Sequence, residues 1–109
     1  MTLAPTGALR RRLTLETPVR SGEDAASATT TWIEAASLWA AVTPLGGREI
    51  VDADGVASRV SHEIELRWRS GITATMRFRE GAVIYVIHAV RDRDPQRRRL
   101  VCLVEEQAP

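Results

Sequence analysis

The chain has 109 residues and a formal net charge of +1, which fits a single domain and gives no overall field to attract nucleic acid. Its residues are 44% hydrophobic and 27% charged, which excludes a disordered or fibrous chain. No apolar stretch approaches the ~20 residues of a membrane-spanning helix, so we expect no membrane partner.

The first part of the chain predicts one strand between two segments with little apolar surface. Residues 1–8 are expected to form a flexible N-terminal arm that precedes a single domain at 9–106. Leucines alternate with arginine, threonine and glutamate over 9–16, which predicts a strand that Pro18 ends. Residues 20–31 contain no large apolar side chain and are predicted to form a mobile loop.

Residues 32–43 fit two kinds of secondary structure. A helix would place Trp32 and Trp39 on one stripe, whereas a strand would place Leu38 and Ala40 on one face. Periodicity alone does not choose between the two, so the segment stays open as helix or strand.

Residues 45–60 are predicted to form the longest connection in the domain. Gly46 and Gly47 break the chain near its start, and acidic side chains outnumber basic ones along it. A connection longer than about a dozen residues in a small domain is usually functional or disordered. We therefore expect a long, weakly structured loop with a role of its own.

Two segments with alternating apolar and polar residues follow. Apolar side chains occupy alternate positions of 61–69 and again of 72–79, and a Ser-Gly pair at 70–71 separates them. The pattern predicts an antiparallel hairpin that places Trp68 and Phe78 in the core.

The last part of the chain predicts two strands around a polar turn. Residues 82–90 are apolar on both faces, so this strand is expected to be covered on both sides. A turn is predicted at 91–96, and 99–105 is the predicted final strand. Together these elements predict a mainly β chain: a single small antiparallel β-barrel or sandwich with long loops and at most one short helix.

The residues that most often carry chemistry do not form a recognisable site. Cys102 is the only cysteine and lies in the predicted final strand, where we expect it to pack as a small hydrophobe. His62 and His88 lack the spacing of a zinc site. No glycine-rich phosphate loop and no nucleophile with a nearby base is found. We therefore expect no metal, no cofactor and no enzymatic activity.

The arginines of the predicted hairpin suggest an alternative function. A small β-barrel with arginines on one strand face can bind oligonucleotides. Trp68 and Phe78, however, are expected on the face opposite Arg67 and Arg77, and a near-neutral chain is a weak electrostatic match. A nucleic-acid-binding barrel therefore stands as the alternative.

Several short segments occur in an informative order. They are Leu9–Leu15, Thr31–Trp32, Leu38–Val42, Gly47–Glu49, Ser61–Arg69, Gly71–Ile72, Met76–Phe78 and Tyr85–Ile87. In this order they resemble the head-tail joining family of long-tailed bacteriophages and gene transfer agents. The resemblance covers about 9–106 and departs from the family at Ser61 and Trp68, where Thr and Tyr are usual.

This resemblance implies a β-barrel or sandwich that assembles into a ring of six or twelve copies. The ring would lie between a portal or adaptor ring and the tail terminator or other tail proteins, and would act as a head-completion stopper or as an adaptor. Packaged double-stranded DNA would pass through its channel. The resemblance also implies a location in a virion or phage-like particle assembled in the bacterial cytoplasm, and a strand at 37–43.

The family's long connection corresponds here to about 45–60 and implies a channel-facing loop that helps to retain DNA. Its acidic side chains would repel phosphate, so closure would depend on packing between the loops of adjacent copies. The candidate gate residues are Arg48, Glu49, Ile50, Val51, Asp52, Asp54 and Val56.

Charge is distributed in blocks along the chain. Basic blocks lie at 1–20, 67–80 and 91–99, and an acidic block lies at 21–66. Blocks of opposite sign suit contacts with neighbouring copies or partner proteins. We expect Arg99 to face a partner, and the other candidate interface residues are Arg10, Arg12, Arg91, Arg93, Arg97 and Arg98.

Overall fold

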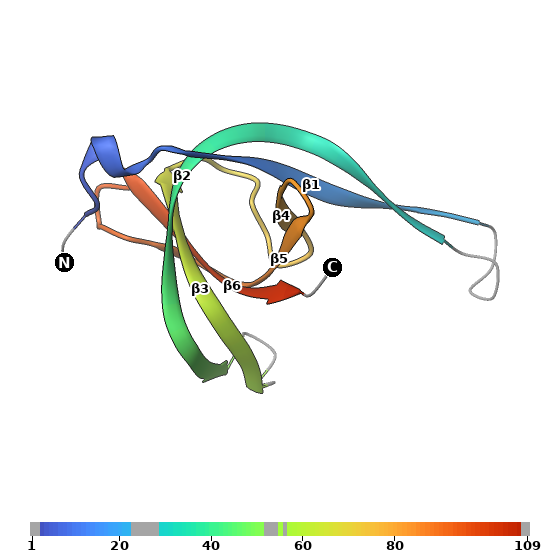
Figure 1. The fold of residues 1–109 in the computed structure, drawn as a ribbon. Coiled ribbons are helices and arrows are strands. Elements are labelled where there is room, and N and C mark those ends of the chain that lie inside the picture. The colour runs from blue at the N-terminus through green and yellow to red at the C-terminus, as the bar shows by residue number, and fades with distance from the viewer. Residues whose placement is uncertain (1–2, 23–28, 52–54, 56, 108–109) are drawn as a thin grey trace.

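Six antiparallel strands close into a barrel in this computed structural model, which describes residues 3–22, 29–51, 55 and 57–107 (Figure 1). The strands follow the order β1-β2-β3-β6-β5-β4, and β4 pairs with β1 to close the ring. The elements are η1 (Thr6–Ala8, a 3-10 helix), β1 (Arg11–Ser21), β2 (Thr29–Val51), β3 (Ala57–Arg67), β4 (Arg77–Glu80), β5 (Val83–Asp92) and β6 (Arg99–Gln107). This architecture confirms the predicted mainly β fold. Within the described ranges, no helix is long and apolar enough to cross a membrane.

The barrel interior holds the larger of two apolar cores. Alternate residues of each strand point inward, and Leu13, Ile64 and Phe78 are fully buried there. Full burial of a side chain of this size contributes about 1.5–3 kcal/mol. A sequence with few long apolar runs can therefore still fill a closed interior.

A smaller core lies on the outside of the barrel. β6 is buried on both faces, because Cys102 belongs to the interior core while Val101 and Leu103 form a second cluster with Val60. The sequence predicted such double cover for 82–90. In the structure β6 has it, whereas in β5 only Tyr85 and Ile87 are buried and the strand ends in two exposed residues.

Two hairpins extend beyond the barrel (Figure 1). In the β1–β2 arm, residues 17–21 pair with 29–33. In the β2–β3 arm, residues 48–51 pair with 57–60. β2 is 23 residues long because it contributes to the barrel and to both arms. The molecule measures 46 Å in its long direction and 29 and 28 Å in the others.

The predicted hairpin of 61–69 and 72–79 is wrong. β3 pairs with β2 and β6, whereas β4 pairs with β1 and β5, and residues 68–76 connect them. Alternation shows which face a residue occupies but not which strand lies beside it, so two successive alternating segments need not pair. Phe78 is fully buried as predicted, but Trp68 is only half-buried.

Parts of the segments predicted as loops form strands in the structure. Residues 32–43 lie in β2, which confirms the strand implied at 37–43. Much of 20–31 and 45–60 also belongs to strands, because polar and β-branched side chains suit a two-stranded ribbon with exposed faces. The parts of these predicted loops that lie outside the described residues are 23–28, 52–54 and 56.

The N-terminal segment is held against the barrel. The backbone N–H of Ala4 donates to the Glu65 carboxylate at 2.8 Å, and the next residues form η1. The sequence did not predict these contacts of residues 3–8, residues 1–2 lie outside the described residues, and the flexibility of the arm stays a prediction. Backbone groups make these contacts, so the scarcity of apolar side chains did not reveal them.

Candidate functional site

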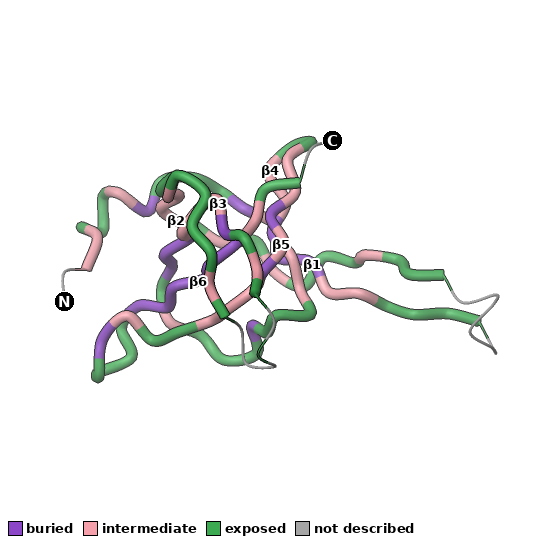
Figure 2. Tube along the Cα trace, turned by 90° about the horizontal axis from the view of Figure 1, so that it is seen from below, coloured by how far each residue is buried: buried purple, intermediate pink, exposed green. Residues whose placement is uncertain are grey.

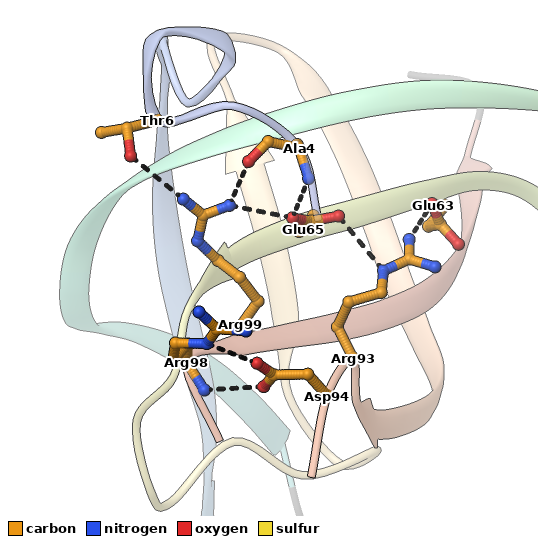
Figure 3. Close-up of polar contacts among 8 residues, drawn as sticks. All are labelled: Ala4, Thr6, Glu63, Glu65, Arg93, Asp94, Arg98 and Arg99. Atoms are coloured by element: carbon orange, nitrogen blue, oxygen red, sulfur yellow. Dashed lines mark hydrogen bonds and ion pairs between the residues drawn. The ribbon is translucent and has the colours of Figure 1, made fainter. Parts of the chain in front are cut away.

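A buried ion cluster surrounds Glu65 of β3 (Figure 3). Only 5% of Glu65 is exposed, and its carboxylate accepts Arg93 Nε at 3.2 Å and Arg99 Nη1 at 3.1 Å. The Ala4 N–H is a third donor. Two cations and a backbone donor thus satisfy a charge that would otherwise be costly to bury.

Arg99 ties the N-terminal segment to this cluster. Its guanidinium also donates to the carbonyl oxygen of Ala4 and, at 3.3 Å, to Thr6 Oγ1 (Figure 3). The sequence predicted Arg99 as a partner-binding residue. Its hydrogen bonds to Glu65 and the N-terminal segment leave it only 7% exposed, so this expectation is wrong.

The turn between β5 and β6 presents two arginines to solvent. Asp94 accepts the Arg98 backbone N–H at 2.9 Å and Arg98 Nε at 2.6 Å. The backbone bond is the largest influence, and together these contacts hold the pKa of Asp94 below its usual range although burial opposes them. Arg97 has a left-handed backbone (φ 54°) and lies over Trp68, 5.5 Å from the ring centre. The two exposed cations therefore stand on a turn with a fixed backbone.

A second buried carboxylate lies where the β1–β2 arm leaves the barrel. Glu16 accepts Arg77 Nε at 2.8 Å and Arg79 Nε at 2.9 Å. Burial favours a raised pKa for Glu16, but the hydrogen bonds from the two arginines outweigh it and lower the pKa. Arg77 also lies over Trp32, 4.1 Å from the ring centre. Ionic and cation–π contacts thus fix the root of the arm.

The predicted gate residues that the structure describes belong to the β2–β3 arm. Arg48 and Glu49 are exposed, Val51 is 66% exposed, and Ile50 is half-buried against the outer core. The other predicted gate residues lie outside the described residues: Asp52, Asp54 and Val56.

An irregularity in strand pairing separates this arm from the barrel. The register of β2 with β3 shifts between Pro44 and Arg48. Gly46 and Gly47 lie within the shift and have φ angles of 71° and 78°, which are open to glycine and strained for other residues. The arm therefore meets the barrel at a joint of low backbone restraint.

The predicted interface arginines lie toward the end of the barrel where β1 and β6 begin, because the strand register aligns the start of β1 with the start of β6. Arg12 lies over Trp39, 5.2 Å from the centre of a ring whose residue is half exposed. Arg93 differs from the others because it is half-buried and bonds Glu63 and Glu65. The exposed members are Arg10, Arg12, Arg91, Arg97 and Arg98.

Sequence reasoning did not identify the two buried carboxylates. Glu16 and Glu65 each occupy a polar position in an alternating strand, a pattern that normally marks a solvated charge. All the arginine partners of Glu16 and Glu65 are more than 25 residues away in the chain, and so is the Ala4 backbone donor. No local signal therefore predicts their burial.

The histidines and the cysteine have packing partners. His88 Nε2 lies 3.0 Å from Glu105 Oε1, and His62 packs edge-on against Tyr85. Cys102 is buried in the interior core, and burial raises the pKa of its thiol to about 12. Among the residues that the structure describes, no group of three or more His, Cys, Asp or Glu side chains could hold a metal ion.

Comparisons with known proteins agree with one another. The family model described as phage head completion protein matches residues 4–107. A chain in the structure of the virion of a native gene transfer agent particle is 32% identical, with a TM-score of 0.71, over 92% of this chain and 96% of that chain. A protein of Shigella flexneri 2a, whose structure was solved in solution, is 25% identical, with a TM-score of 0.68, over 96% of this chain and 98% of that chain. No curated protein matches the sequence significantly.

Proposed function

The chain belongs to the phage head completion protein family, and on this premise we propose that it is a ring-forming connector of a phage-like particle. The family match over residues 4–107 carries the proposal, and the likeness to a chain of a gene transfer agent virion supports it. A ring of six or twelve copies would join a portal or adaptor ring to the tail proteins and complete the head in the bacterial cytoplasm. This role includes no catalytic step.

The arginine-rich end supports docking on an acidic partner ring. Arg97 and Arg98 have side chains that are 67% and 62% exposed, and the turn that carries them is fixed by the bonds to Asp94. Exposed charges of this kind act mainly on the rate and specificity of encounter. The end that carries them is therefore the proposed face toward the portal or adaptor.

The β2–β3 arm is the proposed gate that retains DNA. Gly46 and Gly47 provide a joint at its root, and Val51 offers an exposed apolar side chain for packing against the same arm of adjacent copies. The sequence of 45–60 has more acidic than basic residues, so an open arm would not grip phosphate. DNA could then slide past once the arms separate.

Shortening this arm tests the gate. Replacement of residues 50–58 by Asn-Gly would close the hairpin at the paired residues Glu49 and Arg59 with a favoured two-residue turn. We expect the barrel to fold and particles to assemble, because the interior core is untouched, but the heads to lose their DNA. The measurement is nuclease-protected DNA per purified particle.

A full-length arm provides the matched control. Arg59→Gln changes the net charge of the arm by −1 but keeps its length, Val51 and every candidate gate residue, so these particles should keep their DNA. If the shortened arm also retains DNA at the wild-type level, the gate lies elsewhere and this protein is a spacer in the connector.

A further inference from the structure

The β1–β2 arm has two unlike faces. Residues that pair directly across two strands share a face. One face has no charged residue and consists of Thr17, Val19, Ser21, Thr29, Thr31 and Ile33. Both strands of the arm are exposed over much of their length (Figure 2). Val19 is 43% exposed and Ile33 47% exposed. The other face carries Arg20 and Trp32, and Arg77 covers the tryptophan ring.

One edge of the arm is open as well. β2 pairs with β3 only from Ala40 onward, so residues 29–39 have no strand partner on that edge among the described residues. The edge of β1 contains Pro18 and Arg20, which discourage strand addition, whereas 29–39 contain a single charged residue, Glu34. A long open edge beside an uncharged face is typical of a surface that another chain covers.

A hollow of about 300 Å³ lies on the outside of the barrel, over β6. Its apolar lining comes from Val101 and Leu103 of the outer core. Glu63 and Arg93 also line it and form an ion pair with each other, so they present no unbalanced charge. Arg91 and Asp92 line it as well; both are exposed, and their charges are of opposite sign. The charges of the lining sum to zero, so an uncharged segment can pack on Val101 and Leu103 without burying a net charge.

The arm and the hollow lie toward opposite ends of the molecule. Strand register aligns Arg11 of β1 with Ala40, Ala40 with Leu66, and Leu66 with Leu100 of β6. The hollow is therefore near the start of β1, whereas the arm continues from the other end of that strand. A donor surface and an acceptor surface at opposite ends can join copies head to tail, and such contacts form a ring when the rotation between copies closes.

The length of the arm fits this arrangement. Its five residue pairs extend roughly 17 Å beyond the barrel at about 3.3 Å per residue. The two shorter dimensions of the molecule are 29 and 28 Å. In a ring of touching barrels, the arm would therefore cross more than half of its neighbour.

We propose that the β1–β2 arm of each copy docks, by its uncharged face and open β2 edge, into the hollow over β6 of the next copy. The inference rests on the proposed ring and names the contact that joins its members. The occupant is a second copy of this chain, because one chain carries both complementary surfaces and a net charge of +1 leaves little repulsion between copies.

Disulfide trapping tests this contact in purified particles. Ile33→Cys combined with Arg91→Cys places one thiol on the arm and one beside the hollow, and the natural Cys102 is buried and unreactive. Mild oxidation should give a ladder of dimers, trimers and larger multimers on a non-reducing gel. The matched control is Ile33→Cys with Arg69→Cys, which is exposed but does not line the hollow, and it should give no ladder.

A charge placed on the arm gives a second readout. Ile33→Glu should abolish incorporation into particles while the thermal unfolding midpoint stays at the wild-type value. Thr30→Glu, on the opposite face of the same arm, should be incorporated normally.

The outcomes separate this inference from the proposed function. Intact particles that contain a ring but give no ladder, or give an equal ladder with Arg69→Cys, would overturn the arm contact and leave the connector role standing. Cross-links to a different protein would overturn the proposal that the hollow holds the arm of a second copy of this chain. Absence of any ring of this chain in wild-type particles would overturn both.

Discussion

The barrel and its two arms share strands but differ in how those strands are covered. In the barrel each strand has a neighbour on both sides, and the charges of Glu16 and Glu65 are enclosed by arginines. The arms are two-stranded ribbons that expose Val19, Ile33 and Val51. The contrast teaches that stability is concentrated in the barrel, whereas the arms are available for contacts between molecules.

The largest expected effect is on the interior core. Phe78→Ala should lower the free energy of unfolding by about 3–5 kcal/mol, because Phe78 is fully buried and the cavity cannot reach solvent. Ile33→Ala on the arm should cost less than about 1 kcal/mol. Urea unfolding of both variants measures the difference, and equal losses would remove the distinction between barrel and arm.

The next largest effect concerns the ion cluster. Glu65→Ala should cost about 3 kcal/mol, because it leaves the Arg99 guanidinium buried without its carboxylate. It should also speed hydrogen exchange at the Ala4 amide, because this N–H donates a hydrogen bond to the Glu65 carboxylate in the wild-type protein. Glu49→Ala, an exposed carboxylate on the β2–β3 arm, is the control and should change stability by less than about 0.5 kcal/mol. Similar losses in both variants would contradict the cluster's structural role.

Trp68 should show an intermediate effect. Its ring is half-buried, lies under Arg97 and donates to Asp92 at 2.8 Å. Trp68→Ala should therefore cost about 1–2 kcal/mol, less than a fully buried aromatic residue. A loss as large as that of Phe78→Ala would place the Trp68 ring in the interior core.

Acid should weaken the barrel through its paired carboxylates. The pKa of Glu16 is lowered from the ordinary 4.5 because two arginine hydrogen bonds outweigh burial, and the Arg11 hydrogen bond lowers that of Glu80. A carboxylate whose pKa is lowered by folding stabilises the folded state fully at pH values above about 4.5. This stabilisation is lost as the pH falls through the lowered pKa of the folded state. Glu16→Gln should flatten the fall of the unfolding midpoint below pH 4.5, and an unchanged slope would contradict the pairing.

The smallest effect on stability is expected at the exposed turn. Arg97→Glu combined with Arg98→Glu should lower the unfolding free energy by about 1 kcal/mol, because both side chains are largely exposed although Arg98 pairs with the buried Asp94. Assembly of particles should nevertheless slow, since these charges are proposed to meet an acidic ring. Arg69→Glu, an exposed charge in the connection after β3, is the control. Normal particle yield from the double variant would show that this turn faces solvent.

Alternation in the sequence predicted the strand content and much of the interior core. Ile64, Leu66 and Phe78 are buried as the period of two requires. It could not predict that β3 and β4 lie apart, because a strand's neighbours depend on how the whole barrel closes. Trp68 is half-buried because β3 ends at Arg67, so Trp68 lies just beyond the strand.

The candidate site was less accessible to prediction than the fold. Exposed Arg97 and Arg98 could be anticipated from a polar turn that contains proline. Arg93 and Arg99 lie in the same stretch but bind Glu65, which is about 30 residues away in the chain. The arms were expected as loops because polar ribbons have no buried face to leave a clear alternating pattern.

The place of β6 in the barrel bears on when the protein can fold. β6 is the last of the six described strands along the chain, yet it lies between β3 and β5, and Arg99 at its start holds Ala4 near the beginning of the chain. Neither neighbour gains its partner until this final segment has left the ribosome. Folding that waits for pairings between distant segments is slow. The barrel can therefore close only after pairings between its most distant segments have formed.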